Sequence, residues 1–348
     1  MTQVGRIAID VMGGESGPPV TVPAACRILN TYPDMHVLLV GDQHQIDQQL
    51  DQIADQATDL SSRLSILHTN ETVDDRDKPE SVLRGNRHSS MFLAVNSVRE
   101  GRADACVSAG NTGALLMAGR HLLKTVPGID KPAIVAALPV RQPDRRCLVL
   151  DVGANIECDA GQLCQQALMG SILASTVHGI RRPRVGLLNI GAEDYKGTEE
   201  IHKAAAILAQ WDNIEYLGYI EANRIFSGEI DVLVCDGFAG NITIKAGAGV
   251  VNMVEHMIAD VRVQHPELAG KVDVLFDKIT RELDPARYNG ANLLGLNGVI
   301  VKSHGNASAQ GFFCAIEQAL AAVQQQLPSL IARRVQQAGS LRTTKNGA

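Results

Sequence analysis

Short apolar segments alternate with longer segments of helical periodicity along most of this chain, and this alternation constrains the fold most strongly. Strands that alternate with helices favour a mainly parallel sheet with helices packed on both faces. The expected strands are 4–11, 35–41, 64–68, 103–108, 133–138, 147–152, 184–190, 214–220, 230–236 and 298–303. The expected helices are 18–31, 43–56, 79–99, 112–125, 160–178, 197–211, 240–264, 267–283 and 307–334.

The segment 240–290 interrupts the alternation, because two helical patterns follow each other there with no strand between them. Such a pair is expected to project from the sheet. Two roles stay open for it: a dimer contact, or contact of its amphipathic second helix, 267–283, with a membrane surface. Residues 336–348 are small and basic, which predicts a disordered tail.

Charge and cysteine content exclude several classes of protein. The formal net charge of −6 argues against a nucleic-acid-binding protein. The 7 cysteines form no CxxC pair and most lie in apolar segments, as expected in a reducing cytosol. No apolar segment is long enough for a secretory signal or a membrane span, so we expect a cytoplasmic protein. Basic residues gather in three groups that are either solvated surface or docking sites for phosphate or an acidic partner: Arg141 to Arg146, Arg181 to Arg184, and Arg84 with Arg87 and His88.

The segment 106–114, CVSAGNTGA, joins an expected strand to an expected helix through small and polar residues. The free N–H groups and the dipole at the start of a helix favour an anion. Ser108, Asn111 and Thr112 add polar side chains beside them. The turn therefore predicts a phosphate site, and the structural alternative is an Asn N-cap with nothing bound.

Similar glycine-rich polar segments follow five other expected strands. They are 12–15, 151–155, 190–197, 236–241 and 302–306. Ligands of parallel α/β sheets bind outside the carboxyl ends of the strands. If all six strand ends point one way, they form one large site, and we expect a shared active-site cleft.

Taken together, these motifs resemble a known family, the bacterial phosphate acyltransferases that make acyl phosphate from acyl-acyl-carrier-protein. The resemblance covers nearly the whole chain, from about Ile7 to Arg334. It rests on DVMGG at 10–14, SSM at 89–91, SAGNTGA at 108–114, DVGAN at 151–155, NIG at 189–191 with Glu193 and KG at 196–197, DGFAGN at 236–241, LLGL at 293–296 and HG at 304–305.

The resemblance implies a three-layer α/β/α fold similar to isocitrate and isopropylmalate dehydrogenases and to phosphotransacetylases. It implies one domain over residues 1–335, with a cleft between two lobes, in a homodimer. It implies inorganic phosphate as acceptor and a long-chain fatty acyl thioester of acyl carrier protein as donor. The product would enter phosphatidic acid and phospholipid synthesis, with the membrane acyl-phosphate:glycerol-3-phosphate acyltransferase as a partner at the inner face of the cell membrane. No cofactor is implied, and we expect no metal.

Acyl transfer to phosphate needs no protein nucleophile, because phosphate itself attacks the thioester. The protein must orient phosphate and stabilise the oxyanion that forms on the carbonyl. We expect Lys196 to supply positive charge to phosphate or to the oxyanion, and Asn241 to donate to the oxyanion. We expect His304 to act as a base or phosphate donor, and Asp236 to orient Lys196 or to accept a phosphate proton. Structural roles stay open for each of them. Residues expected to bind phosphate or the acyl group, or to organise the cleft, are Asp10, Gly13, Gly14, Ser108, Gly110, Asn111, Thr112, Gly113, Asp151, Asn155 and Gly240.

Three other functions remain open. A phosphate acetyl- or butyryltransferase would share this chemistry but take its acyl group from coenzyme A. A decarboxylating dehydrogenase would need an arginine-rich substrate motif with paired metal-binding aspartates, which we do not find. A non-catalytic scaffold would recruit lipid enzymes to the membrane through 267–283.

Overall fold

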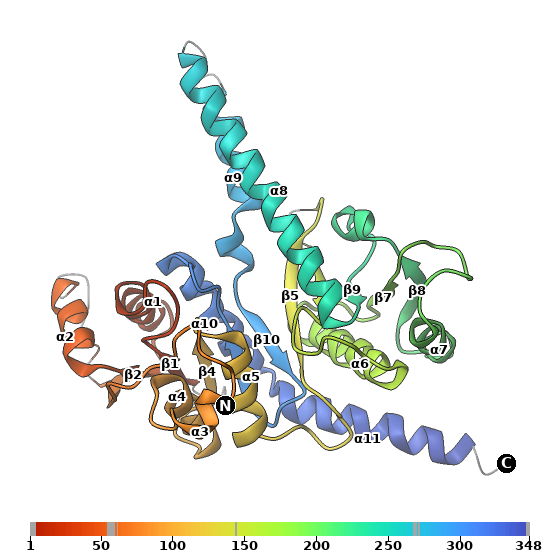
Figure 1. Ribbon diagram of the computed structural model, residues 1–348, viewed down its shortest axis with the longest axis horizontal. Helices are drawn as coiled ribbons and strands as arrows, with labels where there is room; N and C mark the ends of the chain where they lie inside the picture. Colours follow the sequence, from red (N-terminus) through yellow and green to blue (C-terminus); the bar gives the residue numbers. More distant parts are fainter. Residues whose placement is uncertain are drawn as a thin grey trace.

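An eleven-stranded sheet runs through the molecule, with the strand order β3-β2-β1-β4-β11-β10-β5-β6-β9-β7-β8 (Figure 1). The computed structural model describes residues 5–53, 60, 62–142, 145–266, 270 and 272–345. The strands are β1 (Arg6–Asp10), β2 (His36–Gly41), β3 (Leu64–His68), β4 (Ala105–Ser108), β5 (Ala133–Pro139), β6 (Arg146–Leu150), β7 (Arg184–Leu188), β8 (Glu215–Ile220), β9 (Val232–Val234), β10 (Ala291–Leu294) and β11 (Val299–Lys302).

Helices cover both faces of this sheet, so the predicted α/β class with a mainly parallel sheet is confirmed. They are α1 (Pro18–Thr31), α2 (Gln43–Gln52), α3 (Ser81–Arg84), α4 (Ser90–Arg99), α5 (Thr112–Leu122), α6 (Ala160–Thr176), α7 (Glu199–Leu208), α8 (Gly237–Gln264), α9 (Asp273–Leu283), α10 (Ala309–Gln324) and α11 (Leu327–Lys345). Two 3₁₀ segments, η2 (Ala222–Ser227) and η4 (Pro285–Tyr288), complete the set of labelled elements.

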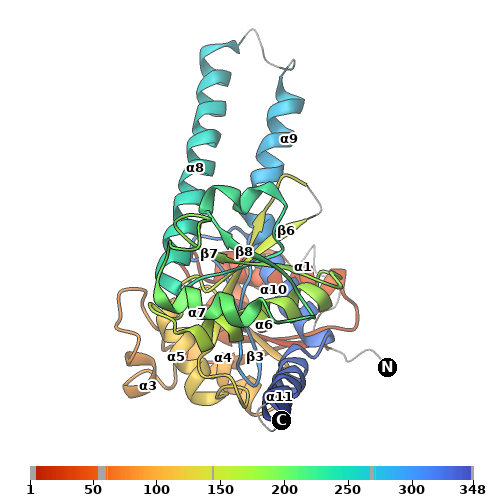
Figure 2. The same cartoon turned by 90° about the vertical axis from the view of Figure 1, so that its right-hand side faces the viewer.

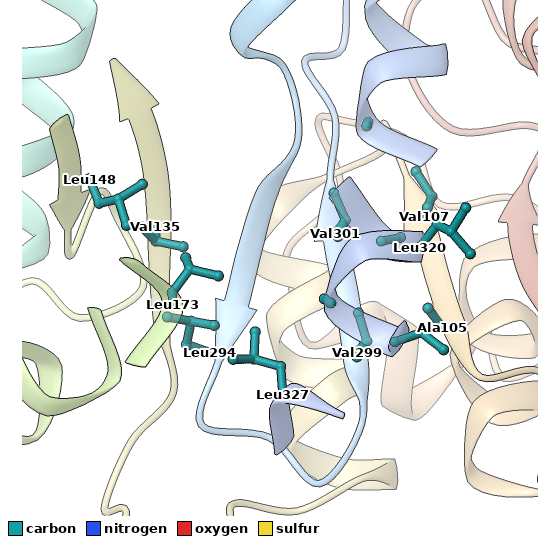
Figure 3. Close-up of a cluster of buried hydrophobic side chains, with 14 of the residues drawn as sticks. Ala105, Val107, Val135, Leu148, Leu173, Leu294, Val299, Val301, Leu320 and Leu327 are labelled. Carbon is teal, nitrogen blue, oxygen red and sulfur yellow. The ribbon is translucent and has the colours of Figure 1, made fainter. Parts of the chain in front are cut away.

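Successive strand residues enter opposite cores, as the period of two requires. Ile7 and Ile9 belong to the buried cluster that α1, α6 and α10 cover on one face, whereas Ala8 belongs to the cluster that includes α4 and α5 on the other. Figure 3 shows Leu320 of α10 against Val107 and Val301 on the first face. Each such aliphatic side chain contributes about 1.5–3 kcal/mol on burial. The core is therefore mainly aliphatic, as a chain with 3% aromatic residues requires.

The two halves of the sheet run in opposite directions, which the sequence analysis did not predict. β1, β2, β3, β4 and β11 are mutually parallel, and so are β6, β7, β8 and β9. The pairings β11–β10, β10–β5 and β5–β6 are antiparallel, so the second group is reversed relative to the first. The expectation that all six polar strand ends point one way is therefore wrong.

Several element boundaries also differ from the predictions. The expected helix 79–99 is divided, because Gly85 ends α3 and the Ser89 hydroxyl caps α4 by accepting from Phe92 N at 3.4 Å. Arg87 and His88 lie in this break, so they do not share a helix face with Arg84. The expected helix 307–334 is divided at Gln326, whose φ is 50°.

Near the C-terminus, α11 continues to Lys345, so helix occupies residues 336–345 of the predicted disordered tail. This stretch lacks Pro and continues the preceding helix, which runs through Gly339. Residues 346–348 lie outside the described residues, as do Val4, 54–56, 267–269 and Lys271 of the predicted elements.

The helices α8 and α9 form a pair that rises away from the sheet (Figures 1 and 2). Arg262 joins them through Asp273 at 3.4 Å and Asp277 at 2.7 Å. The pair exposes large apolar side chains, namely Val250, Met253, Met257, Val263, Val274 and Leu275. Across the described chain, no helix combines the length and apolar character needed to cross a membrane.

Candidate functional site

A buried carboxylate lies at the end of β1. The Asp10 carboxylate accepts the Ser90 hydroxyl through Oδ1 and the Ser108 hydroxyl through Oδ2, both at 2.6 Å. Burial raises the pKa of Asp10, and the two hydroxyl hydrogen bonds offset part of that rise. Ser108 ends the neighbouring strand β4, and its Oγ also accepts from Gly110 N at 3.1 Å. Asp10 therefore fixes the turn that leads into α5.

Glycines let three strand-end loops touch around Asp10. A Cβ on Gly13 would lie 2.7 Å from Gly110 N, and a Cβ on Gly14 would lie 2.8 Å from Gly305 O. Gly14 also has a φ of +88°, which disfavours a side chain. Glu15 N donates to Gly305 O at 2.8 Å. The loops after β1, β4 and β11 thus form one surface, which we call the Asp10 edge.

The start of α5 lies on this edge. Asn111 Oδ1 caps the helix by accepting from Ala114 N at 3.0 Å. Its Nδ2 donates to Asp75 O at 3.0 Å and to Asp77 O at 3.2 Å, so the amide group is engaged in structure rather than free for a ligand. The N–H groups of Thr112 and Gly113 belong to the first turn, where a helix supplies no partner. Those N–H groups are the donors left for an anion.

Lys302, at the end of β11, is a residue that the sequence analysis did not select. Its Nζ donates to Ala109 O at 2.9 Å and to Ser303 O. Burial lowers its pKa to about 8, and the charges of Asp75 and Asp10 oppose that change. A lysine that follows an apolar run usually marks an exposed strand end, so the sequence held little signal for a partly buried one.

His304 lies two residues further along the same loop. Its backbone N–H donates to Asn289 Oδ1 at 3.0 Å, and Asn289 Nδ2 donates to Ser303 Oγ at 2.8 Å. Desolvation lowers the pKa of the His304 imidazole, and the charge of Lys302 lowers it further. The ring is therefore neutral near pH 7 and can accept a proton.

A second cluster surrounds Asp151, just beyond the end of β6. Its carboxylate accepts from the backbone N–H groups of Ile134, Gly153, Ala154 and Asn155, and from Asn155 Nδ2, at 2.7–3.2 Å. Burial nevertheless raises the pKa of Asp151. All of these hydrogen bonds are donated by the protein itself, so the role of Asp151 is to hold this turn in its conformation.

The first turn of α8 packs on that turn. Gly237 N donates to Asn155 O at 2.7 Å, and a Cβ on Gly240 would overlap Asp151 O. Asp236 caps the helix by accepting from Ala239 N at 2.7 Å. Asn241 is partly buried, and its side chain lies beside Gly153. The segments 151–155 and 236–241 thus form one unit, which we call the Asp151 edge.

Lys196 is also in the reversed half of the sheet, in the loop after β7. Its Nζ pairs with Glu193 at 2.9 Å, and both side chains are partly exposed. Asn189 Nδ2 donates to Lys196 O at 2.8 Å and to Gly191 O at 3.2 Å, which shapes the loop. The acidic partner of Lys196 is therefore Glu193, not Asp236 as the sequence analysis considered.

The structure thus divides the predicted site residues between two edges. Asp10, Ser108, Asn111 and His304 lie at the carboxyl ends of one set of strands, and Asp151, Lys196, Asp236 and Asn241 at those of the reversed set. Within the described ranges, no group of three or more His, Cys, Asp or Glu side chains is arranged to hold a metal ion.

Comparison with known sequences identifies relatives that span the chain. A family model described as "Fatty acid synthesis protein" matches residues 5–330. A protein named phosphate acyltransferase from Coxiella burnetii (strain RSA 331 / Henzerling II) is 44% identical over 333 residues, covering 94% of this chain and 96% of its own. One of the same name from Shewanella sp. (strain MR-4) is 44% identical over 333 residues, covering 95% and 96%.

Solved structures share the fold. A phosphotransacetylase from Streptococcus pyogenes has a TM-score of 0.62 at 17% identity, covering 93% of this chain and 95% of its own. A 4-hydroxythreonine-4-phosphate dehydrogenase from Klebsiella pneumoniae has a TM-score of 0.52 at 15% identity, covering 93% and 99%. At such identities the likeness concerns architecture alone, and it confirms the predicted phosphotransacetylase-like fold.

Proposed function

The chain belongs to the fatty acid synthesis protein family and to the phosphate acyltransferases, and we propose that it transfers a long-chain fatty acyl group from acyl-acyl-carrier-protein to inorganic phosphate. The transfer is reversible, and its product is an acyl phosphate for phosphatidic acid and phospholipid synthesis. The observation that carries the proposal is 44% identity to phosphate acyltransferases over 94% of the chain.

Phosphate binds at the Asp10 edge in this proposal. The N–H groups of Thr112 and Gly113 point along the axis of α5, whose positive end favours an anion. The loops after β1 and β11 lie against this turn through Gly13, Gly14 and Gly305. His304, on the third loop, accepts the proton when phosphate enters as its monoanion.

The chemistry follows from the donor and the acceptor. A phosphate oxygen attacks the thioester carbonyl, a C–O bond forms, the C–S bond breaks, and the carrier thiol leaves as a thiolate. Phosphate is the nucleophile, so no protein nucleophile takes part. A neutral amide suits the oxyanion of the thioester carbonyl. We assign this role to Asn241, with Lys196 supplying positive charge to the same oxyanion and Asp236 holding the start of α8. The assignment requires the Asp151 edge to face the carbonyl group that phosphate attacks from the Asp10 edge.

The assembly is part of the proposal. The exposed apolar side chains on α8 and α9 support a homodimer contact through the helical pair, with membrane contact as the second use of the same surface. Arg141, Arg181 and Arg182 are exposed and suit an acidic carrier protein. A peripheral location at the inner face of the membrane would place the product near the membrane acyl-phosphate:glycerol-3-phosphate acyltransferase.

Release of free thiol shows which acyl donor the protein uses. The protein is incubated with palmitoyl-acyl-carrier-protein or palmitoyl-CoA, with and without phosphate, and acyl phosphate is trapped with hydroxylamine after residual thioester is removed. Phosphate-dependent turnover with the carrier-bound donor alone supports the proposal. Turnover with CoA instead assigns the protein to the coenzyme A-dependent transferases. No turnover with either donor favours the scaffold, which liposome binding then tests.

A further inference from the structure

We infer that Lys302 is the cation that contacts phosphate at the Asp10 edge, in the role that sequence patterns assign to Lys196. The inference rests on the proposed function, since it names the residue that neutralises the acceptor at that same site. It is carried by the place of Lys302 on β11 and by the two carbonyl groups that hold its Nζ.

The Lys302 ammonium lies between the two loops that flank the start of α5. Ala109 O belongs to the β4–α5 turn, and Ser303 O belongs to the loop after β11. An ammonium group has three N–H donors. Two are used by these carbonyls, so one remains for a ligand at the edge that also carries the first-turn N–H groups of Thr112 and Gly113.

The charge of Lys302 has no direct acidic partner. In the part of the chain that the structure describes, no carboxylate forms an ion pair with its Nζ, and Asp10 and Asp75 act on it only through longer-range attraction. Asp10 is itself occupied by two serine hydroxyls. A partly buried cation without a counterion is costly, and a bound phosphate dianion would supply the missing negative charge.

Lys196 fits this role less well. Its Nζ already pairs with Glu193 at 2.9 Å, and its loop follows a strand of the reversed half of the sheet. Lys302 and the start of α5 follow the adjacent parallel strands β11 and β4, in which Lys302 is in register with Ser108. Shared strand direction thus brings the lysine and the anion-binding turn together.

Phosphate binding should therefore depend on the protonation of Lys302. Burial lowers its pKa to about 8, so the empty site loses its charge as pH rises above that value, and a bound anion raises the pKa again. The other ionisable groups facing it are Asp10 on β1, Asp75 in the loop beside α5, and His304 on its own loop. Replacing the lysine separates its titration from theirs.

The test uses inorganic phosphate alone as the probe, measured by isothermal titration calorimetry on the full chain. Lys302→Met should weaken phosphate binding about 10- to 100-fold, the loss expected for one charge-assisted hydrogen bond. Lys302→Arg should retain part of the affinity. Lys245→Met, on the exposed surface of α8, is the matched control and should bind like the wild type. Lys196→Met should weaken phosphate binding less than Lys302→Met.

The same variants are then assayed for acyl transfer. The KM for phosphate should rise in Lys302→Met while the KM for the acyl donor stays constant. Wild-type turnover with unchanged phosphate affinity in Lys302→Met overturns the inference and leaves the proposed function intact. Phosphate binding that depends on Lys302 in a wild type without phosphate-dependent turnover supports the inference and overturns the proposed function.

A second measurement covers the case in which Lys302→Met does not fold. Phosphate affinity is followed from about pH 7 to about 9.5 in the wild type and in Lys302→Arg, whose guanidinium stays charged throughout. The wild type should lose more affinity than the arginine variant over this range. Parallel profiles would contradict the inference.

Discussion

Alanine at Gly240 should destabilise the protein by about 3 kcal/mol. The added Cβ would overlap Asp151 O and would lie 2.9 Å from Cys235 Sγ. Overpacking of side chains that can move costs about 1–3 kcal/mol. Here the obstacle is a backbone oxygen, in a turn whose Asp151 carboxylate accepts hydrogen bonds from four backbone N–H groups, so we expect the upper end of that range.

Gly249 on the same helix is the matched control. A Cβ there meets nothing within 4 Å, so alanine should stabilise the protein by about 0.5–1 kcal/mol through helix propensity. Urea unfolding of both variants measures the difference in their free energy of unfolding. The slopes of free energy against urea concentration are compared to confirm that unfolding exposes the same surface in both. Equal midpoints for Gly240→Ala and Gly249→Ala would refute the close packing of α8 on the Asp151 edge.

Three further predictions concern the two edges. Asp151→Asn should lower the unfolding free energy by about 2–4 kcal/mol, because an amide nitrogen would face backbone donors, and an unchanged urea midpoint would contradict this. Asn111→Ala should lower the free energy of unfolding by about 1 kcal/mol through loss of the α5 cap, and it should raise the KM for phosphate. If the free energy of unfolding and the KM both equal the wild-type values, the turn is not part of the phosphate site. Burial lowers the Lys302 pKa from 10.5 to about 8, so the folded chain binds fewer protons than the unfolded chain between these values. Wild-type stability should therefore rise over that pH window relative to Lys302→Met, and a constant difference in urea midpoints would refute the lowered pKa.

Periodicity predicted which residues form most strands and helices. The helix 18–31 matches α1 to the residue, and 64–68 matches β3. β10 was missed because it lies between Gly290 and Gly295 and contains Asn292, and Gly and Asn are residue types that are depleted in strands. Strand direction was not predictable in the same way, because alternation is identical for parallel and antiparallel strands. The antiparallel strands β10 and β5 that reverse half of the sheet are therefore visible only in the structure.

In the candidate site, too, the sequence predicted local features but not the contacts that depend on the arrangement of strands and loops. Glycine-rich strand ends marked the loops that meet at the Asp10 edge, because close backbone approach needs residues without Cβ atoms. The Asn111 cap was one of the two alternatives that the turn allowed, and the structure shows it. The hydrogen bonds of Asn111 to residues 75 and 77 could not be predicted, because those partners come from a loop with no periodic pattern. Lys302 was missed because its burial depends on β4 lying between β1 and β11 and on the loops that follow these strands.

The most direct test of the account is the fate of radiolabelled inorganic phosphate during turnover with palmitoyl-acyl-carrier-protein. If phosphate is the acyl acceptor, label should enter a lipid-extractable, hydroxylamine-sensitive product in a one-to-one ratio with released carrier thiol. Lys302→Met should require more phosphate to reach the same rate. Thiol release without label in the lipid product would mean that water accepts the acyl group, and this result would contradict the account.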